Sequence, residues 1–445
     1  MHLKYDRIGI VDFKGKALNF MFENEEKKER AILSGVHTNS GDIFTDTTNE
    51  TIEELKELAK TAGVEVVGVL VQNRQSPDPG TYIGDGKLEE IRLMAQEQNA
   101  DTVIFDDDLS PVQVRNISDA LNLKVIDRTM LILDIFASRA ITKEGKIQVE
   151  LAQLRYMLPR LVGMGSALSR LGGGIGTRGP GETKLETDRR HIRRKIDSLS
   201  EELRDIEAHR ELLRSRRKKD GRITVALVGY TNAGKSSLLN FLTDANVLAE
   251  NKLFATLDPT ARSLTLSDNR EITLVDTVGF IRKLPHHLIK AFKSTLEEAR
   301  FSDVLIHVTD ASNPEMENHI KVVNSILEEL DATGKPVLAV FNKLDLAPNP
   351  LLVPKNMDGA MRTVSVSLKE NTGTEALLEA LEDVVPGKKQ KVCLLIPYTE
   401  GALLSSLHKD QLVLEEEYTE EGTKIVALID EICYNKMRNY VRRDD

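Results

Sequence analysis

The stretch GYTNAGKSS, residues 229–237, has the composition and spacing of a loop that wraps a phosphate group. Its two glycines let backbone N–H groups approach a β-phosphate, and a helix starting near Lys235 would point its positive end at the same anion. In this pattern Lys235 reaches the β- and γ-phosphate oxygens, and the Ser236 hydroxyl ligates Mg²⁺. The predicted phosphate-binding residues are Gly229, Tyr230, Thr231, Asn232, Ala233, Gly234, Lys235, Ser236 and Ser237.

The segment DTVGF, residues 276–280, could complete a metal and hydrolysis site. Asp276 ends an apolar run, where a carboxylate can hold Mg²⁺ through its water shell, and the Gly279 N–H can contact a γ-phosphate. The upstream loop LFATLDPT, residues 253–260, offers a threonine that could close over both groups when a triphosphate binds. We favour Thr256, with Thr260 as the alternative. The predicted metal ligands are Ser236, Thr256 and Asp276, and the predicted catalytic residues are Lys235, Thr256 and Gly279.

Phe280 occupies the position after this glycine, where many Ras-like enzymes have a glutamine that orients the attacking water. A phenyl ring cannot orient water. Phe280 could simply be a core residue. Alternatively, the free enzyme is slow, and a partner orders the loops or supplies the missing polar group.

NKLD, residues 342–345, ends another apolar run and predicts a purine-recognition loop. The Asp345 carboxylate can accept two hydrogen bonds from the N1–H and N2–H₂ edge of guanine, which adenine lacks. Asn342 would brace the loop, and the stem of Lys343 can lie over the base. The following SLK segment would add backbone contacts through Ser367, Leu368 and Lys369, although a small residue usually follows the serine. These features predict GTP or GDP with Mg²⁺.

The bulk composition limits the class of protein. The chain has 445 residues, two cysteines and a net charge of −10, which excludes a cysteine-based zinc cluster and a generally basic nucleic-acid coat. The N-terminus lacks an apolar signal-peptide core, and no apolar run is long enough to span a membrane. We therefore expect a cytoplasmic protein without a membrane span, and a monomer by default.

Alternating strand and helix patterns predict an α/β fold in four parts. Residues 1–140 form a small parallel α/β domain, with strands expected at 7–13, 64–72, 101–107 and 123–127. Residues 141–220 form an antiparallel helical hairpin with a glycine-rich basic loop. Residues 221–387 form a P-loop GTPase domain with a Ras-like doubly wound sheet. Residues 388–445 form a small α+β domain.

The predicted hairpin carries a concentrated positive charge. Residues 155–195 hold ten Lys or Arg and three acids, a local charge of +7. Such a cluster in an acidic protein is typical of phosphate-backbone binding, and the glycines would let the loop follow an RNA surface. The plainer alternative is a solvated helix face. The predicted RNA contacts are Arg170, Arg178, Lys184, Arg189, Arg190, Arg193 and Arg194.

Several segments outside the nucleotide motifs resemble the HflX family of ribosome-associated GTPases, and residues 223–385 resemble a translation-factor-class GTPase domain. The segments are TYIGDGKLEE, LSPVQVRN, VIDRTMLILDIFASRA, QVELAQLRYMLPRL, RLGGGIGTRGPGETKLETDRR, IPYTEGALLSSL and EEEYTEEGTKI. The resemblance implies binding to the large ribosomal subunit and its RNA, with the hairpin loop near the peptidyl-transferase region. It also implies a role in splitting or rescuing stalled ribosomes under stress.

Two other functions stay open on the residues alone. One is a GTP-gated module for another RNA or protein partner, in which hydrolysis is only a timer. The other is an ATPase remodeller with a second nucleotide site in the N-terminal domain, which Asp345 disfavours for the main site.

Overall fold

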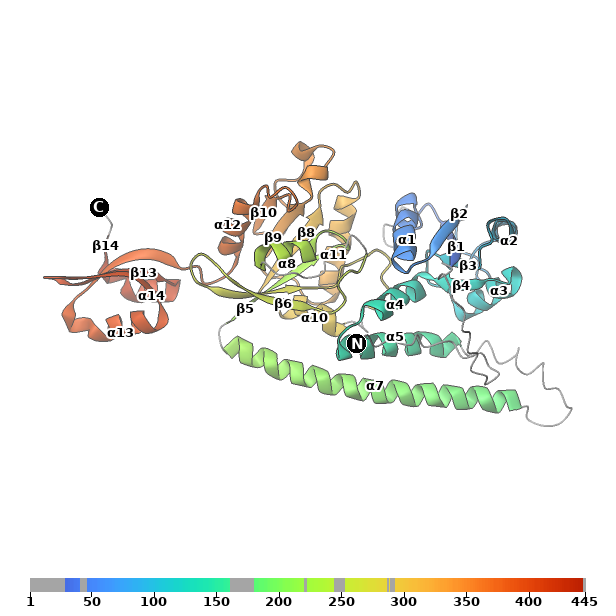
Figure 1. Cartoon of the computed structure of the whole chain (residues 1–445), viewed down its shortest axis with the longest axis horizontal. Helices are drawn as coiled ribbons and strands as arrows, with labels where there is room; N and C mark the ends of the chain where they lie inside the picture. Colours follow the sequence, from blue (N-terminus) through green and yellow to red (C-terminus); the bar gives the residue numbers. More distant parts are fainter. Residues whose placement is uncertain are drawn as a thin grey trace, which may run out of the picture.

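The computed structural model describes residues 29–40, 46–160, 180–219, 222–243, 253–285, 288 and 293–442. These residues form three β-sheets in a row, with two long helices running alongside the first two (Figure 1). Within those ranges, each helix is too short or too polar to cross a bilayer. The strand expected at 7–13 lies outside the described residues.

The N-terminal elements alternate between strand and helix. They are β1 (Arg30–His37), α1 (Asn49–Thr61), β2 (Glu65–Asn73), α2 (Asp85–Gln98), β3 (Thr102–Phe105), α3 (Pro111–Leu121), β4 (Lys124–Asp127) and α4 (Arg128–Arg139). The sheet is parallel in the order β2-β1-β3-β4. Ala31 and Leu33 join the core under α1 and α4, whereas Ile32 joins the core under α2 and α3. The period-2 alternation of a strand thus gives a sheet covered on both faces.

Two of these elements were not anticipated from the sequence. β1 is the central strand that pairs with both β2 and β3, and α4 begins directly at the end of β4. The α4 helix starts where the Asp127 carboxylate accepts a hydrogen bond from the Met130 N–H at 3.0 Å. An aspartate at this position is a strong helix-starting signal.

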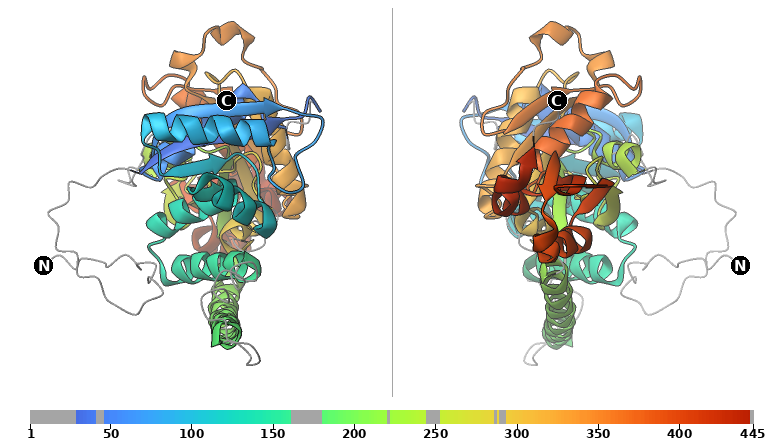
Figure 2. Two further views of the ribbon diagram at one scale, coloured as in Figure 1. Left: turned by 90° about the vertical axis from the view of Figure 1, so that its right-hand side faces the viewer. Right: turned by 90° about the vertical axis from the view of Figure 1, so that its left-hand side faces the viewer.

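The hairpin consists of α5 (Lys143–Arg160) and α7 (Pro180–Lys219). Ion pairs join Lys143 to Glu202 and Lys195 to Glu150, so the helices run antiparallel as expected. The apolar residues of α7 that face α5, such as Ile196 and Leu203, are only half-buried, because two helices alone cover a narrow strip. In both views of Figure 2, α7 lies at the outer edge of the molecule.

The second sheet has the order β10-β9-β8-β5-β7-β6 and is parallel except for the edge strand β6. Its elements are β5 (Ile223–Gly229), α8 (Lys235–Thr243), β6 (Thr260–Thr265), β7 (Glu271–Asp276), α10 (Lys293–Phe301), β8 (Val304–Asp310), α11 (Met316–Glu329), β9 (Val337–Asn342), β10 (Arg362–Ser365) and α12 (Thr374–Val384). α8 and α12 pack on one face, and α10 and α11 on the other. The doubly wound arrangement is confirmed, and β6 is an additional antiparallel strand that was not identified from the sequence.

The third sheet is antiparallel in the order β12-β13-β11-β14. Its elements are β11 (Gln390–Ile396), α13 (Gly401–Asp410), β12 (Leu412–Thr419), β13 (Gly422–Ile429), α14 (Glu431–Met437) and β14 (Val441–Arg442). It has its own small core. The sequence predicted three of these strands and α13, but not α14 or β14.

One hydrophobic core joins the first sheet, the hairpin and the second sheet. It contains Leu55 of α1, Phe136 of α4, Tyr156 of α5 and Phe280, which follows β7. Burial of this kind stabilises the relative positions of the three parts. The nucleotide-binding motifs lie next to this shared core.

Candidate functional site

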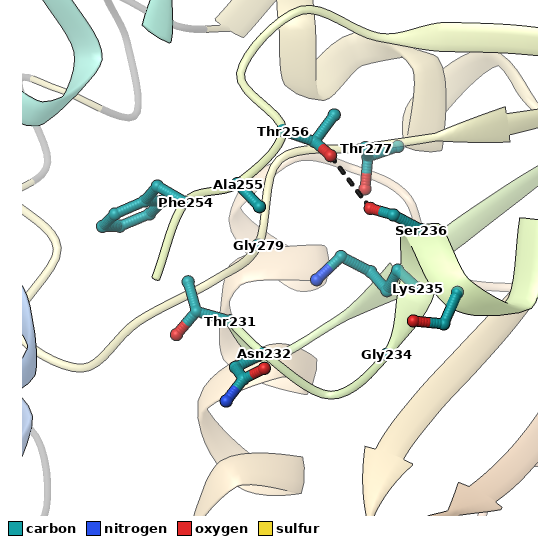
Figure 3. Close-up of a pocket in the computed structure, with 11 residues that line it drawn as sticks. Thr231, Asn232, Gly234, Lys235, Ser236, Phe254, Ala255, Thr256, Thr277 and Gly279 are labelled. Carbon is teal, nitrogen blue, oxygen red and sulfur yellow. Dashed lines mark hydrogen bonds between the residues drawn. The ribbon is translucent and has the colours of Figure 1, made fainter. Parts of the chain in front are cut away.

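A pocket opens where the loops after β5 and β7 meet the loop before β6 (Figure 3). It brings together eight of the predicted site residues and three others. The lining residues are Thr231, Asn232, Gly234, Lys235, Ser236, Ser237, Phe254, Ala255, Thr256, Thr277 and Gly279. Phe254, Ala255 and Thr277 were not predicted individually, although Ala255 precedes Thr256, Thr277 follows Asp276, and Phe254 belongs to the loop 253–260.

The phosphate-wrapping loop needs its glycines for close approach. Gly229 has φ +151°, and a Cβ there would lie 2.2 Å from the Val308 carbonyl oxygen. Gly234 has φ +99°, and a Cβ there would lie 2.2 Å from Nδ2 of Asn342. Side chains at these positions would therefore push the loop off the strands that support it.

Lys235 lies inside the loop that precedes it. Its Nζ donates hydrogen bonds to the carbonyl oxygens of Gly229 (3.1 Å) and Tyr230 (2.9 Å). Burial lowers the pKa of Lys235 to about 8, although the nearby carboxylate of Asp276 favours the charged form. The side chain thus lines the pocket, where its ammonium group can bind an anion.

Three oxygen-bearing side chains converge beside Lys235. The Ser236 hydroxyl lies 2.6 Å from Oδ2 of Asp276 and 2.9 Å from Oγ1 of Thr256. Oγ1 of Thr256 lies 3.0 Å from the same carboxylate oxygen. Of the two candidate threonines, Thr256 is therefore the one placed at the cluster, and Figure 3 shows its contact with Ser236.

The Asp276 carboxylate has unused bonding capacity. Its Oδ1 is buried without a hydrogen-bond partner among the described residues, and burial raises the pKa of the carboxyl group. Buried polar atoms normally have partners. A set of hard oxygen donors with one orphaned carboxylate oxygen fits Mg²⁺, which takes oxygen ligands and retains part of its water shell.

Phe280 is a core residue. Its side chain is 1% exposed and packs in the shared hydrophobic core. Its backbone N–H donates to the Gly229 oxygen at 3.1 Å, and its carbonyl accepts from the Thr231 N–H at 2.7 Å. Phe280 thus ties the loop after β7 to the phosphate-wrapping loop, and its ring does not line the pocket.

The NKLD segment forms a loop at the end of β9. Nδ2 of Asn342 donates to the Ala233 carbonyl at 3.0 Å, which braces the phosphate-wrapping loop. Lys343 has φ +62°, and its Nζ lies 2.7 Å from Oδ2 of Asp310. Oδ1 of Asp345 accepts a hydrogen bond from the Ser367 hydroxyl at 2.6 Å. The Asp345 carboxylate is therefore held by the SLK loop, in which Leu368 is half-buried and Lys369 is exposed.

A buried polar network connects the phosphate-wrapping loop to the first sheet. The Tyr230 hydroxyl donates to Glu54 of α1 and accepts from the Arg282 N–H at 2.8 Å. Arg128 pairs with Glu54 and, at 2.8 Å, with Asp106. Burial raises the pKa of Glu54 although Arg128 lowers it.

Lys283 extends this network from the loop after β7. Its Nζ lies 2.8 Å from both Asp106 and Asp107, and its side chain is 5% exposed. These contacts were not predicted. The FDDD run that ends β3 was a usable signal, because acidic residues at the carboxyl end of a parallel strand lie at the edge where sites form.

The predicted RNA-binding residues fall into three groups. Arg190, Arg193 and Arg194 are exposed on α7, and Arg189 is half-exposed, 3.9 Å from Glu186. Lys184 lies on α7, but its side chain is outside the described residues. Arg170 and Arg178 also lie outside the described residues.

Two other cations of the basic segment are engaged within the protein. The Arg160 guanidinium lies over the Tyr156 ring and donates to Asp127 at 3.0 Å, and Lys195 pairs with Glu150. The local excess of positive charge available to a partner is therefore smaller than the sequence count indicated.

A doubly wound sheet carrying a phosphate-wrapping loop, an oxygen-ligand cluster and an NKLD loop defines a P-loop GTPase. Three family matches cover most of the chain: "GTP-binding GTPase N-terminal" at residues 49–137, "GTP-binding GTPase Middle Region" at 139–217 and "50S ribosome-binding GTPase" at 224–343. The chain belongs to the HflX family of GTPases.

Two sequence relatives carry this assignment, and one solved structure is similar to the chain. GTPase HflX of Caldanaerobacter subterraneus is 50% identical over 95% of this chain and 96% of its own length. GTPase HflX of Escherichia coli is 43% identical over 91% and 94%, respectively. A GTP-binding protein of Sulfolobus solfataricus, solved in complex with GDP, is 28% identical over 80% of this chain and 98% of its own, with a TM-score of 0.43.

Proposed function

We propose that this GTPase acts on the large ribosomal subunit in the cytoplasm as a monomer, and that it splits or rescues stalled ribosomes under stress. The main support is the match of residues 224–343 to the family described as a 50S ribosome-binding GTPase. The exposed arginines of α7 give a suitable surface for ribosomal RNA. We propose that the GTP-bound form binds the subunit and that GTP hydrolysis releases the protein from it.

We also propose specific roles for the pocket residues. Ser236, Thr256 and Asp276 hold Mg²⁺, which supplies charge neutralisation of the phosphates when bound. Lys235 neutralises the β- and γ-phosphate oxygens, and the Gly279 N–H contacts the γ-phosphate. A Cβ at Gly279 would lie 2.8 Å from the Thr231 Cα and 3.0 Å from Nζ of Lys235, so only glycine leaves room there.

Base recognition is assigned to the NKLD and SLK loops. Asp345 accepts from the guanine edge while Ser367 holds its Oδ1. Asn342 and Lys343 shape the loop, and Ser367, Leu368 and Lys369 supply backbone contacts. We also propose that the chain divides into four parts, with boundaries at residues 140, 220 and 387. Each sheet and the hairpin occupy separate stretches of the chain, which supports this division.

Nucleotide binding is expected to take up a proton at mildly alkaline pH. The pKa of Lys235 is about 8 without nucleotide because of burial, and a bound phosphate stabilises the ammonium form and raises this pKa. Between pH 8 and the higher pKa of the complex, GDP affinity should fall as pH rises, by up to about tenfold per pH unit.

Calorimetry in buffers of different ionisation enthalpy measures the proton uptake directly. About half a proton per GDP is expected at pH 8, and much less at pH 6.5, where Lys235 is already charged. Equal uptake at both pH values would contradict this assignment.

Binding of ribosomal subunits is expected to depend on the α7 arginines. Replacing Arg189, Arg190, Arg193 and Arg194 with glutamine should weaken co-sedimentation with large subunits in the presence of a non-hydrolysable GTP analogue. A plot of the logarithm of the subunit-binding constant against the logarithm of salt concentration should also become less steep, by about 1 for each phosphate-binding arginine that is removed. GDP binding should be unchanged.

A matched control removes the same four charges from exposed sites elsewhere, at Lys60, Arg92, Arg115 and Lys409. If the α7 variant still co-sediments with large subunits as the unaltered protein does, the assignment of the RNA-binding surface to α7 is wrong. Absence of subunit binding by the unaltered protein in any nucleotide state would favour the alternative, a GTP-gated module for another RNA or protein partner.

A further inference from the structure

The switch loop, defined here as residues 253–260, is fixed to α4, the helix that precedes the hairpin, by a hydrophobic contact upstream of Thr256. The Phe254 side chain is 2% exposed, and its ring packs edge-on against Phe136 of α4, with centroids 4.8 Å apart. Phe254 has φ +54°, a conformation that residues other than glycine adopt rarely. Tertiary packing must therefore hold the backbone in this state.

A polar contact fixes the switch loop on the other side of Thr256. Oδ2 of Asp258 accepts hydrogen bonds from the backbone N–H groups of Ile141 (2.7 Å) and Thr142 (2.9 Å), and Oδ1 accepts from the Thr142 hydroxyl. Oγ1 of Thr142 in turn accepts from the Gly145 N–H at 3.0 Å, which caps the first turn of α5. The Asp258 carboxylate thus secures the start of the hairpin helix, where the helix dipole favours a negative charge.

The close approach of Asp258 to α5 depends on Gly145. A Cβ at Gly145 would lie 2.4 Å from Oδ1 of Asp258 and 3.2 Å from Oγ1 of Thr142. Gly145 is buried within a helix, where alanine is ordinarily more favourable than glycine. Substitution by alanine would therefore displace the Asp258 carboxylate, the mobile end of a side chain, without opposing helix formation.

We propose that Phe254 and Asp258 are positioning residues that hold Thr256 at the metal site by attaching the switch loop to α4 and to the start of the hairpin, so that triphosphate binding and the position of the hairpin are coupled. They lie two residues before and two residues after Thr256; Phe254 contacts α4, and Asp258 contacts the two residues that immediately precede α5. This inference rests on the proposed role of Thr256 as a metal ligand. Because such coupling is reciprocal, a partner that moves α5 changes triphosphate affinity, and bound triphosphate stabilises the start of α5.

The first test compares two ligands, GDP and a non-hydrolysable GTP analogue with Mg²⁺, by equilibrium titration of the full chain. Asp258→Ala and Gly145→Ala should each lower the affinity for the analogue by about tenfold, or ~1.4 kcal/mol. The affinity of each variant for GDP should stay within about twofold of that of the unaltered protein. A residue that only stabilises the fold would affect both ligands alike. Gly86→Ala is the matched control, since it also lies in a helix and its Cβ would meet nothing within 4 Å.

Thr256→Ala separates this inference from the function on which it rests. If Thr256→Ala weakens binding of the analogue while Asp258→Ala and Gly145→Ala do not, Thr256 keeps its metal role and the coupling is refuted. If Thr256→Ala has no effect on the analogue, the proposed metal role itself fails.

Amide hydrogen exchange gives the reciprocal measurement. In the unaltered protein, the N–H groups of Ile141 and Thr142 should exchange at least about fivefold more slowly with the analogue than with GDP, in line with typical coupling energies. Asp258→Ala should abolish that difference. Equal exchange in both nucleotide states of the unaltered protein would refute the coupling even if the affinity changes were observed.

Discussion

Replacing Asp345 with asparagine is expected to weaken GDP binding by at least about three orders of magnitude. The carboxylate would accept hydrogen bonds from two guanine donors, whereas the asparagine amide would present a donor to one of them. That mismatch leaves polar groups unpaired at the base edge. Ser367 already donates to Oδ1 of Asp345 at 2.6 Å, so the carboxylate has little freedom to compensate. Calorimetric titration with GDP measures the loss.

A complementary ligand makes this experiment specific. Xanthosine diphosphate presents a carbonyl where guanine has its amino group, so the asparagine variant should bind it more tightly than it binds GDP. Asp358→Asn, at an exposed position between β9 and β10, should leave GDP binding unchanged. If the variant binds GDP as the unaltered protein does, or if the unaltered protein binds ADP and not GDP, the assignment of Asp345 to base recognition is wrong.

Purified large ribosomal subunits are expected to raise the rate of GTP hydrolysis by about 10³–10⁵-fold. The phenyl ring of Phe280 is buried in the core, and none of the described residues that line the pocket is a glutamine or histidine that could orient the attacking water. The free protein should therefore turn over slowly until a partner orders the loops or supplies a polar group. Single-turnover measurements with and without subunits give the ratio.

The control for this measurement is the variant that lacks the four α7 arginines. It should hydrolyse GTP at the same slow rate as the unaltered protein in the absence of subunits, but should gain much less from them. A free protein that already hydrolyses GTP at the stimulated rate would show that the missing group is present within the chain.

The nucleotide motifs could be located from sequence because each combines an apolar strand with a short polar segment at its end. The run ITVALVG before the phosphate-wrapping loop coincides with β5. Ser236, Thr256 and Asp276 lie in contact with one another, and their role as metal ligands stays a prediction. β6 was missed because TARSLT lies at a sheet edge and has little apolar alternation. α4 was missed because it begins directly after β4, so that Asp127 is both the last residue of the strand and the helix-starting residue.

Contacts between distant segments could not be predicted from one sequence. Tyr230 and Glu54 are 176 residues apart, and Asp258 and Thr142 are 116 apart. Tyr230 and Asp258 lie in predicted site loops, but their local patterns do not indicate these partners, since each pairing depends on how the three-dimensional parts pack. The exposed arginines of α7 were identifiable by charge density, but the internal engagement of Arg160 depended on the fold.

The ion pairs of Lys283 with Asp106 and Asp107, together with the hydrogen bond from Tyr230 to Glu54, constrain how the first sheet can separate from the GTPase sheet. Losing one partner of a buried charge pair costs about 3–5 kcal/mol, because the remaining charge has neither its partner nor full hydration. A slight opening would separate Lys283 from Asp106 and Asp107 before water could hydrate these charges. Intermediate angles should therefore be sparsely populated, and a fluorophore on each body would report two discrete distances instead of a continuous range.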